Sequence, residues 1–338
     1  MRYAPDPGLN MLVNYFRQNQ PVVLFALLPV VLLLWPGGAP PPAGTLALEP
    51  SGMPLYRAFV GLCPPGSWTL HGLGLCLVIG VALQLNYTMN ASELFARRNF
   101  LPALLLPLLL ALFTRGLAPE PALVGMPFVL WAVRRLWASQ SDHRVIGPLF
   151  DAGLLIGLAS LCYLPYVFLV VVFWSSISVM RPFHWREYLM PLLGAGVVLG
   201  LTWSMAHLWH VWTWEPVSSF MKPPQAIQLL PAPHWLWRIL LLLVALAFLV
   251  ATVPVFAAGY ARGIMREKNT RASFLAFSFA FGLLASFSWL LRETIPPVLI
   301  ALPFAVLFSW PLLQAKRTAW AELGVLALLL LGLWARWA

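Results

Sequence analysis

The sequence predicts an all-α, polytopic integral membrane protein, and three observations carry that prediction. Hydrophobic residues make up 61% of the 338 residues and charged residues only 9%, whereas soluble domains average about 45–50% and about 25%. Several apolar runs approach the roughly 17–25 residues that a helix needs to cross a bilayer. Basic residues occur singly and in pairs between these runs, which is typical of membrane orientation. We therefore expect membrane lipids as partners and no nucleic acid.

The apolar runs predict about eleven transmembrane helices, within a range of about nine to twelve. All belong to a single multi-span membrane domain covering residues 1–338. Two longer connections, 36–68 and 213–235, mix prolines with apolar and aromatic residues, so we expect them to be extracytoplasmic loops lying along the membrane interface. The expected spans are 21–35, 69–88, 100–116, 121–137, 148–163, 165–180, 189–212, 236–256, 273–291, 297–314 and 320–337.

Charge distribution predicts the orientation of these spans. Most lysines and arginines fall in the connections on one side of the predicted membrane, the side that also holds the N-terminus. Because cytoplasmic loops carry the excess of basic residues, the N-terminus is expected in the cytoplasm and the C-terminus outside. No small-residue cleavage site follows the first apolar run, so we expect that run to stay in the membrane as an anchor.

The stretch RPFHWREYLMP, which begins at Arg181, is unusually polar for its apolar surroundings. One interpretation is an ordinary membrane-edge loop, with its arginines at lipid phosphates and its aromatic residues in the interfacial belt. In this interpretation Glu187 complements the dipole at the start of a helix. The alternative is an anion site, in which Arg181, His184 and Arg186 bind a phosphate or a phospholipid-like headgroup.

A second polar stretch, NYTMNASELFARRNFLP, begins at Asn86. Asn86 and Asn90 are four residues apart and are expected to share one helix face. Glu93 and Arg97 repeat that spacing and could pair, and Asn99 could cap the next helix. Asparagines near the end of a span need hydrogen-bond partners within the bundle, so a structural role stands beside a binding role.

The stretch FDAGLLIGLASLCYLPY places Asp151 at the start of a predicted span. A carboxylate there can cap the helix or pair with an arginine from a neighbouring inner loop. Gly153 and Gly157 form a small-xxx-small face that favours close helix packing.

The sequence gives little support for a metal site or for an ion-coupled transporter. His207 and His210 could share a metal, but no third ligand has a characteristic spacing, and the cysteines match no metal motif. We therefore predict no metal and no cofactor. Charged residues are absent from the middle of the predicted spans, which disfavours an ion-coupled transporter.

Three stretches carry a resemblance to a known family: ARRNFLPALLLPLLLALF, FDAGLLIGLASLCYLPY and RPFHWREYLMPLLG. In this order they resemble an uncharacterised family of polytopic inner-membrane proteins from Bacteroidota, over roughly the first two-thirds of the chain. The R-P-F-x-W-R-E element is the most specific part, and the family often carries Asn at the position of His184. The resemblance implies a bacterial inner (cytoplasmic) membrane and a role in the cell envelope, but no activity.

The leading hypothesis is an envelope-biogenesis protein that handles an anionic lipid or a polyprenyl-phosphate-linked sugar at the cytoplasmic leaflet. The sequence leaves open whether the protein is an enzyme, and a non-enzymatic scaffold of an envelope complex and a transporter are the alternatives. The candidate catalytic residue is Asp151, as a base or as a group that orients an arginine. The candidate substrate-binding residues are Asn86, Asn90, Arg97, Arg98, Arg181, His184, Arg186 and Glu187.

Overall fold

The computed structural model describes most of the chain and shows an all-helical protein. The described residues are 12–17, 23–35, 53–62, 68–114, 119–141, 145–181, 183–208, 235–292, 295–315 and 318–337. Every regular element within these ranges is an α- or 3₁₀-helix. The predicted all-α class is therefore confirmed.

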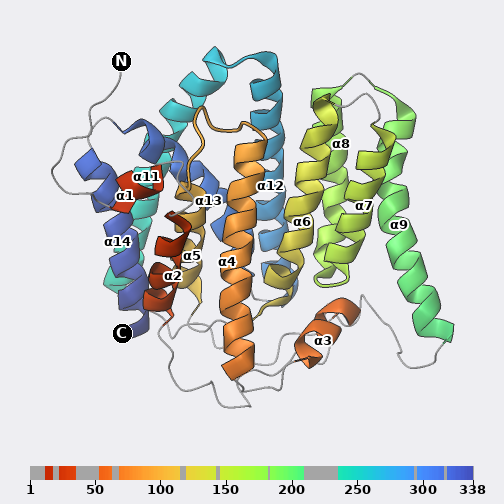
Figure 1. Ribbon diagram of the computed structural model, residues 1–338, viewed down its shortest axis with the longest axis horizontal. Coiled ribbons are helices and arrows are strands. Elements are labelled where there is room, and N and C mark those ends of the chain that lie inside the picture. Colours follow the sequence, from red (N-terminus) through yellow and green to blue (C-terminus); the bar gives the residue numbers. More distant parts are fainter. Residues whose placement is uncertain are drawn as a thin grey trace.

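From α4 onward the α-helices alternate in direction along the chain (Figure 1). Two short 3₁₀ segments, η1 (Ser139–Ser141) and η2 (Leu164–Phe168), extend α6 and precede α8. The α-helices are α1 (Leu12–Arg17), α2 (Val23–Leu34), α3 (Pro54–Gly61), α4 (Trp68–Ala91), α5 (Leu101–Phe113), α6 (Pro121–Ala138), α7 (Ile146–Ser160), α8 (Leu169–Met180), α9 (Trp185–Leu208), α11 (Trp235–Arg262), α12 (Met265–Arg292), α13 (Pro297–Gln314) and α14 (Thr318–Trp337).

A helix lies in each of the expected span ranges, but the helices differ in their capacity to cross a bilayer. Within the described part of the chain, 5 helices are both long and apolar enough: α4, α9, α11, α12 and α13. Others, such as α5 and α7, are apolar but shorter. The structure therefore supports a membrane protein with several spans, and the number of eleven remains a prediction.

The short helix α5 is the centre of the bundle. Every residue from Leu101 to Leu112 is buried, which is the pattern of a helix that is apolar all round and surrounded by protein. Helices α2, α4, α13 and α14 pack around it. Because neighbouring helices cover α5, its length need not match the thickness of a bilayer.

One end of the bundle collects the helix ends that carry basic residues, and we call it the basic end (top of Figure 1). Helices α4, α6, α8, α11 and α13 finish there, and α5, α7, α9, α12 and α14 begin there. Among the described residues, the opposite end holds fewer cations: Arg57 in α3, Arg238 at the start of α11, and Arg292 and Arg336 near the ends of α12 and α14. The described arginines and lysine of the basic end are Arg17, Arg97, Arg98, Arg134, Arg135, Arg181, Arg186, Arg262, Arg266, Lys268 and Arg271.

Helices α7 and α9 cross at a glycine-lined contact, as the spacing of Gly153 and Gly157 predicts. A Cβ atom built on Gly153 would lie 2.2 Å from the carbonyl oxygen of Pro191, and one on Gly157 would lie 2.8 Å from Cβ of Val198. The partner face of α9 contains Gly194, where a Cβ would lie 2.4 Å from the carbonyl oxygen of Phe150. The backbones approach closely because hydrogen atoms replace side chains at these positions.

The expected extracytoplasmic loops are described only in part. From the loop expected at 36–68 the structure describes α3 and its neighbours, and α3 lies at the end opposite the basic end (Figure 1). Tyr56 of α3 packs with Leu70, Val124 and Cys162. Nearly all of the loop expected at 213–235 lies outside the described residues.

Candidate functional site

The last turns of α6 form a hub that contacts several other helices at the basic end. Trp137 Nε1 donates a 2.8 Å hydrogen bond to Ser273 Oγ of α12, and that hydroxyl donates in turn to Ser176 Oγ of α8, also at 2.8 Å. Arg134 donates to the hydroxyl of Tyr87 on α4 and covers its ring, with 4.4 Å from Cζ to the ring centroid. The hub therefore fixes α4, α8 and α12 around the candidate residues.

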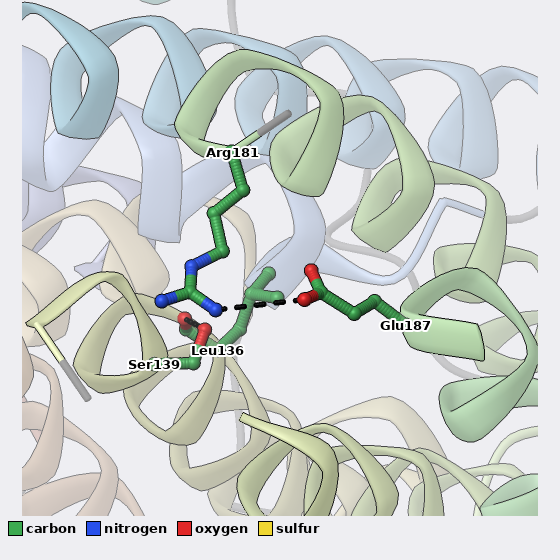
Figure 2. A network of polar contacts seen from close by, with 4 residues as sticks. All are labelled: Leu136, Ser139, Arg181 and Glu187. Carbon is green, nitrogen blue, oxygen red and sulfur yellow. Dashed lines mark hydrogen bonds and ion pairs between the residues drawn. The ribbon is translucent and has the colours of Figure 1, made fainter. Parts of the chain in front are cut away.

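Arg181 and Glu187, both candidate binding residues, form an ion pair beside this hub. The atoms Nη1 and Oε1 are 3.6 Å apart, and the side chains are 23% and 12% exposed. Figure 2 shows the guanidinium of Arg181 next to Leu136 and Ser139, at the C-terminal end of α6. A cation is favourable there because the last carbonyls of a helix carry partial negative charge.

The second oxygen of this carboxylate is unusual. Glu187 Oε2 is buried and accepts no hydrogen bond from the described residues. The carboxylate depends on Arg181 for its neutralisation, while Glu187 also lies in the first turn of α9, where the helix dipole favours it. Arg181 is therefore committed to an internal partner, which weakens its predicted role as a phosphate ligand.

Asp151 does not cap its helix, because α7 begins at Ile146, one and a half turns earlier. The carboxylate instead lies 4.0 Å from Nη2 of Arg135 on α6, and both side chains are close to half exposed. This arrangement agrees with the alternative role of pairing with a neighbouring arginine. An exposed pair of this kind contributes about 0–1 kcal/mol.

Asn90 and Asn99 tie the end of α4 to the start of α5. Asn90 Nδ2 donates to the carbonyl of Asn99 at 2.8 Å, and the N–H of Asn99 donates to Asn90 Oδ1 at 3.3 Å. Asn99 Oδ1 accepts from the N–H of Leu101, the first residue of α5, at 3.1 Å, but the N-cap position is Phe100, so Asn99 bonds to the start of the helix from one residue before its cap. Asn90 is therefore occupied in holding a loop, which reduces its capacity to bind a headgroup.

The predicted helical pair of Glu93 and Arg97 is wrong. Helix α4 ends at Ala91, and Glu93 has a positive φ of 53°, so the two residues are not on one helix. Glu93 Oε2 lies instead 3.9 Å from Nη1 of Arg266 on α12. Asn86 shares α4 with Asn90, as predicted, and its Oδ1 atom is buried without a hydrogen-bond partner among the described residues.

Pairing of the acidic side chains leaves a surplus of arginines at the basic end. Glu93, Asp151, Glu187 and Glu267 each lie within 4.0 Å of an arginine nitrogen. At the basic end, the exposed cations that make no ion pair with any described residue are Arg97, Arg98, Arg186 and Arg262.

The candidate residues thus share one end of the bundle but form separate clusters. Three clusters lie at different helix junctions: the hydrogen-bonded Asn90 and Asn99, the Asp151–Arg135 pair and the Arg181–Glu187 pair. His184 is exposed, and the exposed Arg186 lies over the ring of Trp185 with 5.7 Å from Cζ to the centroid.

Sequence reasoning missed Arg271, the most deeply buried of the described arginines with a salt-bridge partner. Its side chain is 5% exposed, and Nη2 lies 3.6 Å from Oε2 of Glu267. The guanidinium covers the ring of Trp310, with 4.8 Å from Cζ to the centroid. The signals available in the sequence were the Gly259-x-x-x-Gly263 spacing at the end of α11, which makes room for this side chain, and the direct continuation of MREKNTR into an apolar run.

Comparisons with known proteins give no relative. No family model matches the sequence, and neither a curated protein nor a solved structure matches it.

Proposed function

We propose that this protein binds the phosphate headgroup of an anionic lipid or a polyprenyl-phosphate-linked sugar at its basic end. In this proposal the basic end faces the cytoplasm of a bacterium, the membrane is the inner membrane, and the role is in cell-envelope biogenesis. The observation that supports it is the surplus of unpaired arginines, because four of the acidic side chains described at the basic end already have arginine partners: Glu93, Asp151, Glu187 and Glu267.

Three of these cations are the proposed contacts with lipid headgroups. Arg97 and Arg98 lie exposed in the loop between α4 and α5, and Arg186 lies exposed in the first turn of α9. Exposed aromatic residues stand beside Arg186: Phe183 is 73% exposed and Trp185 is 63% exposed. Aromatic rings and arginines together are typical of the level of lipid headgroups.

Removal of charge from this surface should weaken lipid binding. The double variant Arg97→Gln/Arg98→Gln is expected to bind a polyprenyl phosphate about 30-fold more weakly, since each basic residue near an anionic surface contributes about 1 kcal/mol. Native mass spectrometry of the purified protein, titrated with the lipid, measures the bound fraction.

The matched control is Arg57→Gln/Arg238→Gln, which removes the same charge from the opposite end. It should bind the lipid as the unmodified protein does. Equal losses in the two double variants, or no loss in either, would contradict the proposal and favour a scaffold whose cations serve only membrane orientation.

A further inference from the structure

We propose that Arg271 and Trp310 form a second binding site, for a phosphate oxyanion, at the junction of α11, α12 and α13. This site is separate from the exposed arginines of the proposed function and stands whether or not those arginines bind lipid. Its ligand would bind by displacing the carboxylate of Glu267 from Arg271.

The first argument is an excess of buried donors. Arg271 Nε, Arg271 Nη1 and Trp310 Nε1 are all buried, and none has a hydrogen-bond partner in the described part of the chain. The two side chains are stacked on each other, so these donors belong to one local group. Buried polar groups in folded proteins are normally hydrogen-bonded, which makes an acceptor from outside the chain the expected partner.

The second argument is the chemistry of that acceptor. A guanidinium stacked on an indole is a rigid donor group, and arginine recognises phosphate through several N–H groups at once. Arg271 and Lys268 lie on α12 with Arg266, while the only acidic groups described nearby are Glu267 and Glu93. The junction is therefore cationic and suits an anion with several acceptor oxygens.

The third argument is the close approach of the backbone to the donors. A Cβ atom built on Gly259 would lie 3.2 Å from Arg271 Nη1, and one on Gly263, just after α11, would lie 3.3 Å from the same atom. At these two positions backbone packs against Nη1, and no side chain competes with a ligand for it. Glu267 is 36% exposed and its Oε2 would lie 3.0 Å from the Cβ built on Gly263. The carboxylate thus reaches from the surface to the guanidinium.

Glu267 is an internal competitor in this arrangement. Its carboxylate lies 3.6 Å from Arg271 Nη2, at a distance that gives charge attraction without a hydrogen bond. An entering phosphate would take this place and also accept from the donors that Glu267 leaves unpaired.

The test is binding of two probes to the full-length protein in neutral detergent. Inorganic phosphate and a short-chain phosphatidic acid carry the same oxyanion, one free and one on a lipid. Glu267→Gln should raise the affinity for a probe several-fold, because it removes the competing charge. Trp310→Phe keeps the ring and loses one donor, and it should lower the affinity about tenfold. Arg271→Gln should abolish binding at this site and leave the binding of lipid to the exposed arginines unchanged.

The matched control is Arg238→Gln, which removes an exposed cation of α11 at the opposite end and should leave binding unchanged within about twofold. Binding of phosphatidic acid alone, lost in Arg271→Gln, would identify a lipid headgroup as the source, and binding of both probes would identify phosphate itself. The proposal is overturned if neither probe binds, if Arg238→Gln and Arg271→Gln lose the same affinity, or if Glu267→Gln fails to raise it. Should Arg271→Gln not fold, unchanged binding by Trp310→Phe would overturn the proposal equally.

Discussion

Replacement of Gly194 by valine is expected to separate α7 from α9 and to lower the free energy of unfolding by about 2–4 kcal/mol. A Cβ on Gly194 would lie 2.4 Å from the carbonyl oxygen of Phe150 and 2.7 Å from the backbone nitrogen of Leu154. Backbone atoms of a packed helix cannot move aside as a flexible side chain can, so the helices themselves must shift. Unfolding of the purified protein by a denaturing detergent measures the loss.

The same helix provides the control. Gly196 lies two residues further along α9, and nothing lies within 4 Å of a Cβ built there. Gly196→Val changes the helix propensity in the same way but meets open space, so its effect should stay within about 0.5 kcal/mol. Similar losses at the two positions would show that helix propensity, and not the close crossing, determines the stability.

Replacement of Arg181 by glutamine is expected to lower the free energy of unfolding by about 2–3 kcal/mol, because it leaves a buried carboxylate without its cation. Glu187 is 12% exposed and its Oε2 atom already has no hydrogen-bond partner among the described residues. The double variant Arg181→Gln/Glu187→Gln should recover most of the loss, since it removes the uncompensated charge. A double-mutant cycle measures the coupling directly.

Arg186→Gln is the comparison for this cycle, because its side chain is exposed and pairs with no described acid. It should change the stability by less than about 0.5 kcal/mol. An additive cycle, in which the double variant loses as much as the two single variants together, would show that Arg181 and Glu187 do not stabilise each other.

The sequence was informative about elements because apolar runs and their breaks are local features. The observed helices begin a few residues before the predicted spans where polar residues continue a helix. Helix α12 begins at Met265 and not at 273, and α9 begins at Trp185 and not at 189. A charged first turn resembles a loop when only hydropathy is considered. For that reason the sequence predicts that Arg271 lies in a surface loop, whereas the structure places it within α12.

Partners distant in sequence could not be predicted. Glu93 pairs with Arg266, and the atoms meet only because α4 and α12 end and begin at one end of the bundle. The spacing of Gly153 and Gly157 predicts a close contact but does not identify Gly194 as its partner. The burial of a side chain could not be predicted either, since the donors of Arg271 are buried only by the packing of three helices.

The candidate site contains one feature that the sequence predicts and one that it does not. The polar residues were expected at one face, and their helix ends do share the basic end (Figure 1). Their division into separate clusters follows from pairing, because Arg181, Asn90 and Asp151 each satisfy a neighbour within the protein. The proposed lipid binding rests on the exposed arginines that have no such partner among the described residues.

The most direct test of the account is the side of the membrane on which the basic end lies. Cysteines would be introduced by His184→Cys, at an exposed residue of the basic end, and by Leu62→Cys, at a residue 82% exposed next to α3, in a chain whose own cysteines have been replaced. A membrane-impermeant maleimide is then added to cells whose outer membrane alone has been opened. The account predicts labelling of the Leu62→Cys protein at once, and of the His184→Cys protein only after the inner membrane is lysed. Labelling of the His184→Cys protein in cells with an intact inner membrane would contradict the proposed orientation.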